Sequence, residues 1–535
     1  MKRLKLLALM ALLACVIAGV VCVSSPLAPV VGGPVEIEEL WSIEDTREES
    51  WEPLVTALEN FGVPLAYDKI ENTFYCSLGL KNGEEWPELK LTAPDAPGVS
   101  ICFSDDYTYD YCANAIAEGY SYELMAYTDT EYSYFYIVFT GLPVVSIRTQ
   151  EEITLEEGYA RFAIGSVDQG SLSCEGLVRL RGDGSLYGTE KLSYRLSFSQ
   201  NRKHAMREVP FLGVVEKINL VSMAFDDTLM HDKLSWDLIE MMTKENDPFR
   251  ARKTQYVEMF VNDEYQGVYL MMEPIDYEIE IGKANSTALV TDTLYRTTVV
   301  DRVRSRPVMP GERTTGYELF YSLSTKDLFE PLEDFLTMRN TNDDMQFEEL
   351  ALRQLDFKNV LGYSILLQIT GMTDNVRNNL FIWVHYDRGK KTYRFMPWDM
   401  DRAWAADGGI GNCRWMVFPL ADRLLNLNIG NSREKLQEIW VKMKTLGFTV
   451  ETINQLTNDY EKELNDSGAA LRNAYRWNAS LADGTIIRQY ASERFIFIEK
   501  LIKEIVKDEG EIEFLSDENY DRGKTYVDVK GGYLP

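Results

Sequence analysis

The chain has 535 residues, of which 45% are hydrophobic and 12% are aromatic, so it is long enough for two or three domains and too apolar to be disordered. Lys and Arg number 55 against 84 Asp and Glu, which gives a net charge of -29. This field repels phosphate backbones and anionic bilayers. The composition therefore argues against nucleic-acid binding and favours a basic protein or peptide as partner.

The N-terminus has the layout of an export signal. Lys2, Arg3 and Lys5 precede an apolar run over residues 6–23. Lipid attachment at Cys15, a single anchoring helix and free secretion are all compatible with this run. We therefore expect residues 1–23 to direct export to the extracellular face of the membrane or beyond. Contact with a membrane is expected through this segment alone.

The next part of the chain predicts a linker and a small domain. Residues 24–36 are rich in Pro, Gly and Val and are typical of a linker. Residues 37–149 are dense in Tyr, Phe, Thr and Val, with expected strands at 73–78 and 132–139 and an expected helix over 51–61. We interpret residues 37–149 as a strand-rich accessory domain.

Residues 150–509 predict a second, larger domain of α+β class. The expected strands and hairpin come first, and the expected helices follow from residue 346 onward, interrupted by two strands. The expected strands are 177–180, 192–198, 217–221, 254–261, 268–272, 380–385 and 393–396, and the expected helices are 230–243, 347–370, 432–446, 451–474 and 486–507. A sheet-rich N-lobe before a helical C-lobe is the order of bilobal protein-kinase-like folds. Residues 510–535 are charged and glycine-rich, and we expect a loose tail.

Three segments carry candidate chemistry, and the first is a glycine-rich turn between two expected strands. Gly184 and Ser185 lie in this turn, and Lys191 begins the second strand. Glycines let backbone N–H groups approach phosphates, and a nearby lysine supplies a positive charge for them. A plain hairpin with a Gly-Ser turn has the same pattern.

The second segment follows a long apolar helix. Asp374 and Asn379 have the D-x-x-x-x-N spacing of kinase catalytic loops, although no His-Arg pair precedes the aspartate. A carboxylate at the first position can accept the proton of an attacking hydroxyl, and an amide oxygen at the second can hold a metal. An Asp/Asn-rich helix end is the structural alternative.

The third segment, MPWDMDRAW, ends a strand with Asp399 and Asp401. Alternate residues of an extended backbone point to the same side, so the two carboxylates are expected to lie together. Mg²⁺ and Mn²⁺ prefer oxygen ligands of this kind. A simple ion pair with Arg402 is the structural alternative.

Together these segments resemble the spore coat protein H (CotH) kinase family. The resemblance rests on RLRGDGS…KLSYRLSF, NDEYQGVYLMMEPID, DNVRNNLFIW and MPWDMDRAW, and spans residues 152–506. It implies an exported, atypical protein kinase that uses ATP and Mg²⁺ or Mn²⁺ to phosphorylate serine residues, in spore formers on coat proteins.

The resemblance also implies roles for single residues. Asp374 would be the catalytic aspartate, and Asn379 a metal or phosphate ligand. Asp399 would be the principal metal ligand, with Asp401 beside it as a second ligand or structural anchor. Lys191 would hold the α- and β-phosphates.

Other implied roles are less specific. Glu273 lies where a kinase hinge would pass the adenine, although an ion pair inside the fold would equally explain it. Arg181 matches the family's R-G element. Asp237 or Glu240 would pair with Lys191.

The sequence departs from the family at one position, where His231-Asp232 replaces the usual arginine at the start of the expected helix over 230–243.

Two other classes of function remain as alternatives. One is a non-catalytic surface binding or adhesion protein, a pseudokinase with the same fold. The other is metal-dependent hydrolysis, which has only the carboxylates in its favour.

Overall fold

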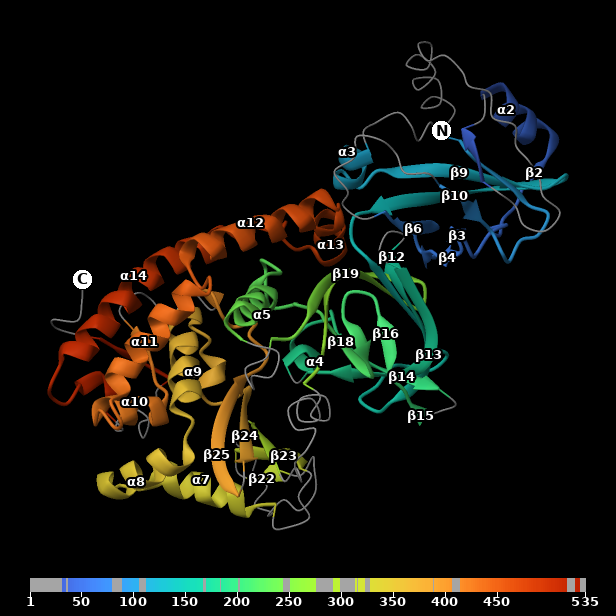
Figure 1. Cartoon of the computed structure of the whole chain (residues 1–535). Helices are drawn as coiled ribbons and strands as arrows, with labels where there is room; N and C mark the ends of the chain where they lie inside the picture. Colours follow the sequence, from blue (N-terminus) through green and yellow to red (C-terminus); the bar gives the residue numbers. More distant parts are fainter. Residues whose placement is uncertain are drawn as a thin grey trace.

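The computed structural model shows a mixed α+β protein, elongated from a sheet at one end to helices at the other (Figure 1). The predicted export segment lies outside the residues that the structure describes. These are residues 31–34, 37–78, 89–104, 112–166, 170–182, 184–200, 203–243, 251–275, 292–298, 313–314, 316–322, 328–387, 389–406, 414–516 and 525–529.

The first sheet has seven strands in the order β1-β8-β9-β10-β6-β5, with β2 paired to β10. The elements of this part are β1 (Val31–Pro34), α2 (Ile37–Thr46), β2 (Glu48–Glu49), β5 (Ala66–Asp68), β6 (Thr73–Ser77), β8 (Ser100–Phe103), α3 (Cys112–Ala117), β9 (Ser121–Tyr127) and β10 (Glu131–Thr140). A small three-stranded sheet, β4-β3-β7, accompanies it, formed by β3 (Glu59–Asn60), β4 (Val63–Pro64) and β7 (Leu91–Thr92). The two expected strands in this region are confirmed as β6 and β10.

The expected helix over residues 51–61 is wrong. Backbone N–H groups of this segment bind side chains elsewhere in the sheet: the Leu54 N–H donates to Ser133 Oγ at 3.0 Å and the Thr56 N–H to Asp95 Oδ2 at 3.1 Å. Val55 is buried in the core of the sheet. These long-range partners replace the i to i-4 bonds that a helix would need.

The second sheet closes on itself. Its strand order is β13-β12-β11-β19-β20-β18-β14-β15, and β13 also pairs with β14. Its strands are β11 (Val144–Arg148), β12 (Gly158–Ser166), β13 (Gly170–Arg181), β14 (Ser193–Gln200), β15 (Lys203–His204), β18 (Lys217–Val221), β19 (Thr254–Val261) and β20 (Glu264–Met272). Val178, Leu196, Ile218, Val257 and Met271 belong to one buried cluster enclosed by the ring. A short hairpin of β16 (Arg207–Val209) and β17 (Gly213–Val215) lies beside it.

The β19–β20 hairpin is confirmed where the sequence predicted it. Asn262 and Asp263, between the strands, have φ of 50° and 61°. Two consecutive left-handed residues define the type I′ turn that fits the twist of paired strands, and Asn and Asp tolerate this region. Gly267 has φ of 88° next to a register shift in the hairpin. A Cβ there would meet Asn473 Oδ1 at 2.5 Å, so α13 (Ala469–Trp477) packs directly on this backbone.

An aromatic and ionic contact joins the first sheet to the second. The rings of Tyr75 and Tyr265 stack with centroids 5.4 Å apart. Tyr265 donates to Glu258 Oε1 at 2.6 Å, and Arg472 of α13 donates to both carboxylate oxygens of Glu258 at 2.8 Å. Because Glu258 is fully buried, this pair is shielded from solvent and fixes α13 against the hairpin.

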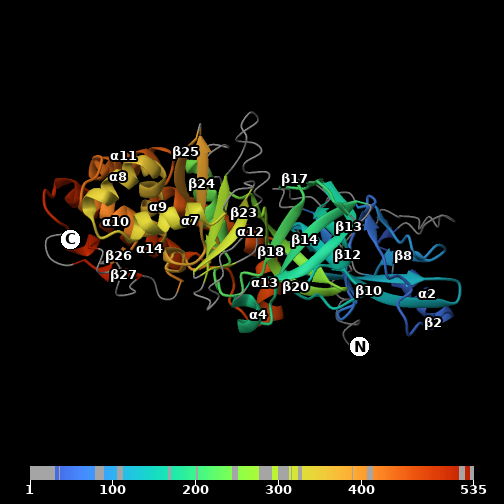
Figure 2. The ribbon, with the colours of Figure 1, turned by 90° about the horizontal axis from the view of Figure 1, so that it is seen from below.

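The third sheet is antiparallel, in the order β22-β23-β21-β24-β25. Its strands are β21 (Thr293–Thr297), β22 (Arg313–Thr314), β23 (Tyr317–Ser322), β24 (Leu380–Asp387) and β25 (Lys390–Pro397). The sequence predicted β24 and β25 but not the other three. Figures 1 and 2 show the hairpin β24–β25 beside the helices that complete this part of the chain.

These helices are α7 (Glu330–Asn340), α8 (Asp344–Gln354), α9 (Phe357–Thr370), α10 (Pro419–Asn426), α11 (Ser432–Thr445), α12 (Val450–Asp466), α13 and α14 (Thr485–Lys507). Two predicted helices are each divided in two. Asp356 caps α9 by accepting from the Asn359 N–H at 3.2 Å, and Gly468, with φ of 69°, separates α12 from α13. Caps and left-handed glycines end helices regardless of the apolar pattern that continues across them.

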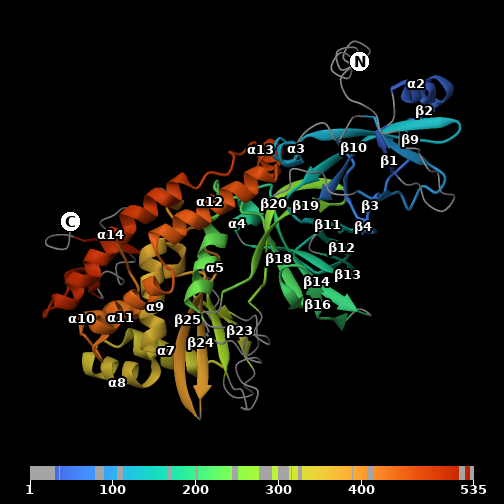
Figure 3. The same cartoon turned by 45° about the horizontal axis from the view of Figure 1, so that its top comes forward.

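The last residues pack onto the helices. The 3-10 helix at Glu513–Leu515 buries Phe514 and Leu515, and β27 (Tyr526–Asp528) pairs with β26 (Arg414–Met416). This differs from the loose tail expected for residues 510–535. Figure 3 shows α12 and α14, the longest helices, running along the molecule. In the described part of the chain, no helix is both long and apolar enough to cross a membrane.

Candidate functional site

The loop that carries Asp374 begins where α9 ends. Most residues of α9 are buried, as expected for a helix that is apolar on all sides, and it ends at Gly371, with φ of 67°. The chain then forms a 3-10 turn over Asp374–Val376. Asp374 accepts from Asn378 Nδ2 at 2.9 Å through Oδ1 and from Asn379 Nδ2 at 2.7 Å through Oδ2. Two amides hold the carboxylate, and lone pairs remain on both oxygens for a further donor.

The β24–β25 hairpin joins this loop to the Asp399 segment. Leu380 pairs with Pro397, and one step further the Trp398 N–H donates to the Asn379 carbonyl at 3.0 Å. The buried Asn375 amide donates to the carbonyls of both Asn379 and Trp398, at 3.0 and 2.7 Å. The two sequence motifs are therefore one hydrogen-bonded unit.

The backbone is strained on both sides of this junction. Asn379 has φ of 51° and Asp399 has φ of 56°. A left-handed conformation outside glycine is uncommon and concentrates at functional sites. Asn and Asp tolerate it better than other residues, which fits the residue types found here.

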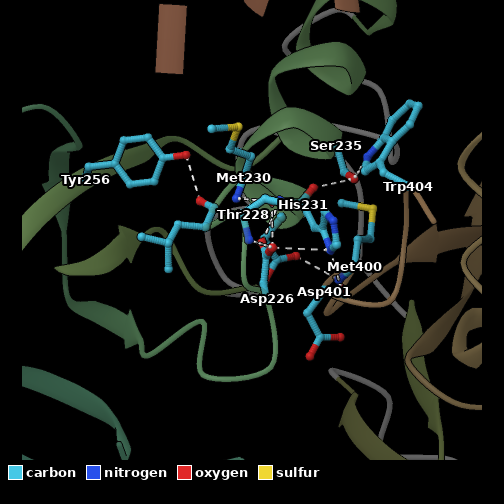
Figure 4. Close-up of polar contacts among 11 residues, drawn as sticks. Asp226, Thr228, Met230, His231, Ser235, Tyr256, Met400, Asp401 and Trp404 are labelled. Atoms are coloured by element: carbon cyan, nitrogen blue, oxygen red, sulfur yellow. Dashed lines mark hydrogen bonds and ion pairs between the residues drawn. The ribbon is translucent and has the colours of Figure 1, made fainter. Parts of the chain in front are cut away.

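The start of α5 (His231–Met242) holds the other end of the Asp399 segment (Figure 4). Asp232 Oδ1 accepts from the Met400 N–H at 2.7 Å, and His231 Nδ1 lies 2.8 Å from the Asp401 carbonyl. Ser235 Oγ accepts from Trp404 Nε1 at 2.9 Å. In Figure 4 the Asp401 carboxylate points away from His231. The pair that departs from the family pattern thus positions the D-x-D backbone.

Three carboxylates at this site, those of Asp232, Asp399 and Asp401, are close enough for their charges to interact. Burial and, after it, the charge of neighbouring Asp399 raise the pKa of Asp232 to about 7, against the opposing effects of the Met400 N–H and Arg181. Burial raises the pKa of Asp401 to about 9, with Asp399 and Asp232 acting in the same direction. A cation in contact with these carboxylates would favour their ionised forms and oppose both shifts.

Arg181, on β13 of the second sheet, lies close to these carboxylates, and it is the arginine of this sheet that the family resemblance singled out. The guanidinium of Arg181 lies 5.7 Å from the Trp398 ring centroid. Burial lowers the pKa of Arg181, whereas Asp399 and Asp232 raise it. Arg179 lies two residues before it on β13, and Arg195 is opposite Arg179 on β14.

Lys191 lies between α4 (Gly184–Gly188) and β14, which begins at Ser193. It is buried, and its ammonium donates to the Val268 carbonyl at 2.7 Å and to Asn473 Oδ1 at 2.9 Å. The expected pairing with an acid of α5 is wrong, because Asp237 instead binds Lys233 and Tyr460, and Glu240 is exposed. Burial lowers the pKa of Lys191 to about 7. Its assignment to phosphate binding stays a prediction.

The remaining predicted residues, Gly184, Ser185 and Glu273, are distant in sequence from the D-x-D segment. Gly184 begins α4 (Gly184–Gly188), a short helix within the expected glycine-rich turn between two strands, and the Ser185 side chain is outside the described part. Glu273 follows β20, is buried, and donates its N–H to the Lys253 carbonyl at 3.1 Å.

A hollow of about 450 Å³ lies next to the Asp374 loop. Val376, Arg377 and Asn378 form part of its wall, together with aromatic residues such as Phe335 and Phe418. Its size is in the range of small-ligand sites.

A cation would find oxygen donors here but not a complete cage. Among the residues that the structure describes, no group of three or more His, Cys, Asp or Glu could hold a metal ion. Asp399, Asp401 and the Asn379 amide oxygen are hard donors that suit Mg²⁺ or Mn²⁺. Mg²⁺ commonly takes one or two carboxylates and completes its shell with water and phosphate oxygens, so this incomplete set fits a metal that arrives with a nucleotide.

The family model described as CotH kinase protein matches residues 178–503, more than half of the chain. The chain therefore belongs to the CotH kinase protein family, and the resemblance predicted from the motifs is confirmed. The match includes the Arg181 strand, α5, the Asp374 loop and the D-x-D segment. No curated protein matches the chain.

Proposed function

We propose that this protein is an exported protein serine kinase of the CotH type, dependent on ATP and a divalent metal. One observation carries the proposal: the Asp374 loop and the Asp399 segment form a single hydrogen-bonded unit through Asn375, Asn379 and Trp398. Family membership supports a kinase-like activity.

In the proposed reaction Asp374 is the general base. The hydroxyl oxygen of a substrate serine attacks the γ-phosphorus of ATP, and the hydroxyl proton passes to the Asp374 carboxylate. The bond between the γ-phosphorus and the β–γ bridging oxygen breaks, and ADP leaves with that oxygen. The amides of Asn378 and Asn379 keep the carboxylate in one orientation, which is what a positioned base requires.

The metal would be held by Asp399, with Asp401 and the Asn379 amide oxygen beside it. When bound, the cation supplies electrostatic stabilisation of the charge on the phosphates. Asp232, His231 and Ser235 position the backbone that carries these carboxylates.

The proposed architecture is a bilobal kinase-like domain over residues 150–509, with the closed second sheet as N-lobe and the third sheet and helices as C-lobe. One strand of the second sheet, β11, precedes these residues. The first sheet would then be the accessory domain, and Glu273, at the end of β20, would lie where the chain passes the adenine. The packing of α13 onto the β19–β20 hairpin supports a fixed relation between these parts.

The proposed substrate is a basic, serine-containing protein outside the cell membrane, such as a coat protein where the host forms spores. The net charge of -29 supports a basic partner and disfavours nucleic acid. Export through residues 1–23, with lipid attachment, an anchoring helix or free secretion, completes this proposal.

A second candidate is a non-catalytic binding protein with the same fold. The hydrogen bonds of Lys191 to Val268 and Asn473 favour it, because they occupy the lysine that the kinase reading assigns to phosphates. The two candidates differ in nucleotide binding.

A thermal-shift titration with ATP and Mg²⁺ or Mn²⁺ tests the proposal. At 100 times Kd, a ligand stabilises the folded chain by about 2.7 kcal/mol. We expect stabilisation of the wild type, its loss in Asp399→Ala, and its retention in the control Asp387→Ala, which removes an exposed carboxylate at the end of β24. Equal melting temperatures with and without nucleotide in the wild type would favour the binding protein.

A further inference from the structure

Three arginines share one face of the β13–β14 hairpin. Arg179 and Arg195 are directly paired across the strands, and Arg181, paired with Ser193, follows on the same side. The opposite face carries Val178, Tyr194 and Leu196 of the enclosed core. The arginines therefore lie on the outside of the closed sheet.

This placement of like charges is costly. Like charges opposite each other on antiparallel strands destabilise the pair, and partial burial adds to the cost. Arg296 of the third sheet adds a fourth charge from another element. Burial, as the largest cause, and the charges of Arg181, Arg179 and Arg296 lower the pKa of Arg195 to about 9. Guanidinium groups from two separate sheets are therefore close enough for their positive charges to repel one another.

Two acids near the arginines, Glu318 and Glu157, already accept hydrogen bonds from other side chains. Arg296 donates to Glu318 at 2.8 Å, and Ser197 donates to Glu157. The charge of Glu157 raises the pKa of Arg195 and so opposes the effect of the neighbouring arginines. Arg195 donates to Asn219 Oδ1 at 2.9 Å. The Nε of Arg296 is buried and has no partner among the described residues.

The cluster lies beside the proposed metal ligands. Arg181 contacts Trp398, whose neighbour in the chain is Asp399. Guanidinium groups bind phosphate oxygens through paired N–H donors, so a row of them suits several phosphates in series.

We infer that the arginine face formed by Arg179, Arg181, Arg195 and Arg296 is an oxyanion site that takes the terminal phosphates of a nucleotide. The inference rests on the proposed function and deepens it, because it gives phosphate binding to arginines of two sheets and leaves Lys191 a structural role.

Binding of four probes to the full chain with Mn²⁺, measured by calorimetry, tests the inference: ATP, ADP, AMP and inorganic tripolyphosphate. Arg179→Gln is the informative variant, since the only described hydrogen bond of its side chain goes to the adjacent Leu180 carbonyl. We expect it to weaken ATP and tripolyphosphate binding about tenfold to a hundredfold and to leave AMP binding unchanged. Arg179→Lys should recover part of the loss, because it keeps the charge but not the paired donors.

The matched control is Arg161→Gln on neighbouring β12, an exposed arginine paired with Glu175. It should bind all four probes as the wild type does. If the wild type binds ATP and Arg179→Gln binds every probe equally well, the inference is wrong while the proposed function stands. If the wild type binds tripolyphosphate but no nucleotide, the arginines form a polyphosphate site only, and both the nucleotide assignment and the proposed function are wrong. Binding of none of the probes overturns the inference.

Discussion

The buried ammonium of Lys191 makes the stability of the protein depend on pH in a direction that can be measured. Burial lowers its pKa from 10.5 to about 7 in the folded chain. Between these two pH values the unfolded chain holds a proton that the folded chain has lost, so raising the pH stabilises the fold. Below pH 7 both states are protonated, and the full cost of burying the charge is present.

The magnitude follows from the two pKa values. The slope approaches about 1.4 kcal/mol per pH unit, and integration from pH 7 to pH 9 gives a gain of about 2 kcal/mol. Lys191→Met has no group to titrate and should lack this gain. Other ionisable groups contribute equally to both proteins, so the difference between their curves isolates Lys191.

Urea unfolding followed by tryptophan fluorescence at several pH values from 7 to 9 measures this difference. Lys69→Met is the control, because Lys69 is an exposed lysine that pairs with Glu264. We expect the control to follow the wild type. Parallel curves for the wild type and Lys191→Met would refute the reasoning, because they would show that Lys191 keeps its proton in a solvated or phosphate-facing position.

Three further predictions concern contacts that hold the site and its supports. Arg472→Met leaves the buried Glu258 carboxylate without its bidentate partner and should lower the free energy of unfolding by about 3–5 kcal/mol in denaturant titrations, whereas an unchanged midpoint would contradict the burial of this pair. Asp232→Asn keeps an oxygen for the Met400 N–H but cannot ionise. Because the pKa of Asp232 is raised to about 7 in the folded chain, the wild type should lose stability as pH rises from about 4 to 7, and the variant should lose less. Identical dependence of unfolding free energy on pH in the two proteins would count against the raised pKa. Asp356→Ala removes the cap of α9 and should cost about 1 kcal/mol by the same titration, with no effect if the cap is replaced by water.

Local patterns predicted the elements that carry the site. The bounds of β18 and β19 agree with the sequence prediction, and α5 begins one residue later than expected. Asp374 and Asn379 are close in sequence, so their contact followed from spacing. These features depend on interactions within a few residues.

Long-range pairing determined what the sequence did not reveal. Lys191 binds Asn473, 282 residues later, and Arg179 meets Arg195 only because of the register of two strands. The third sheet inserts β21 next to β24, and β21, β22 and β23 lie in a part of the chain for which no strand was predicted. Side-chain spacing in one segment contains no information on such partners, because they depend on packing between distant segments.

Transfer of the labelled γ-phosphate of ATP to a basic, serine-containing peptide, with Mg²⁺ or Mn²⁺, tests the kinase proposal most directly. The wild type should label the peptide, and Asp374→Asn should reduce the rate by about two to four orders of magnitude. The variant keeps an oxygen for only one of the two amide donors, so a small fall in melting temperature is expected while the chain stays folded. Labelling by Asp374→Asn at the wild-type rate would contradict the role given to this carboxylate, and release of phosphate with no labelled protein would assign the site to hydrolysis instead.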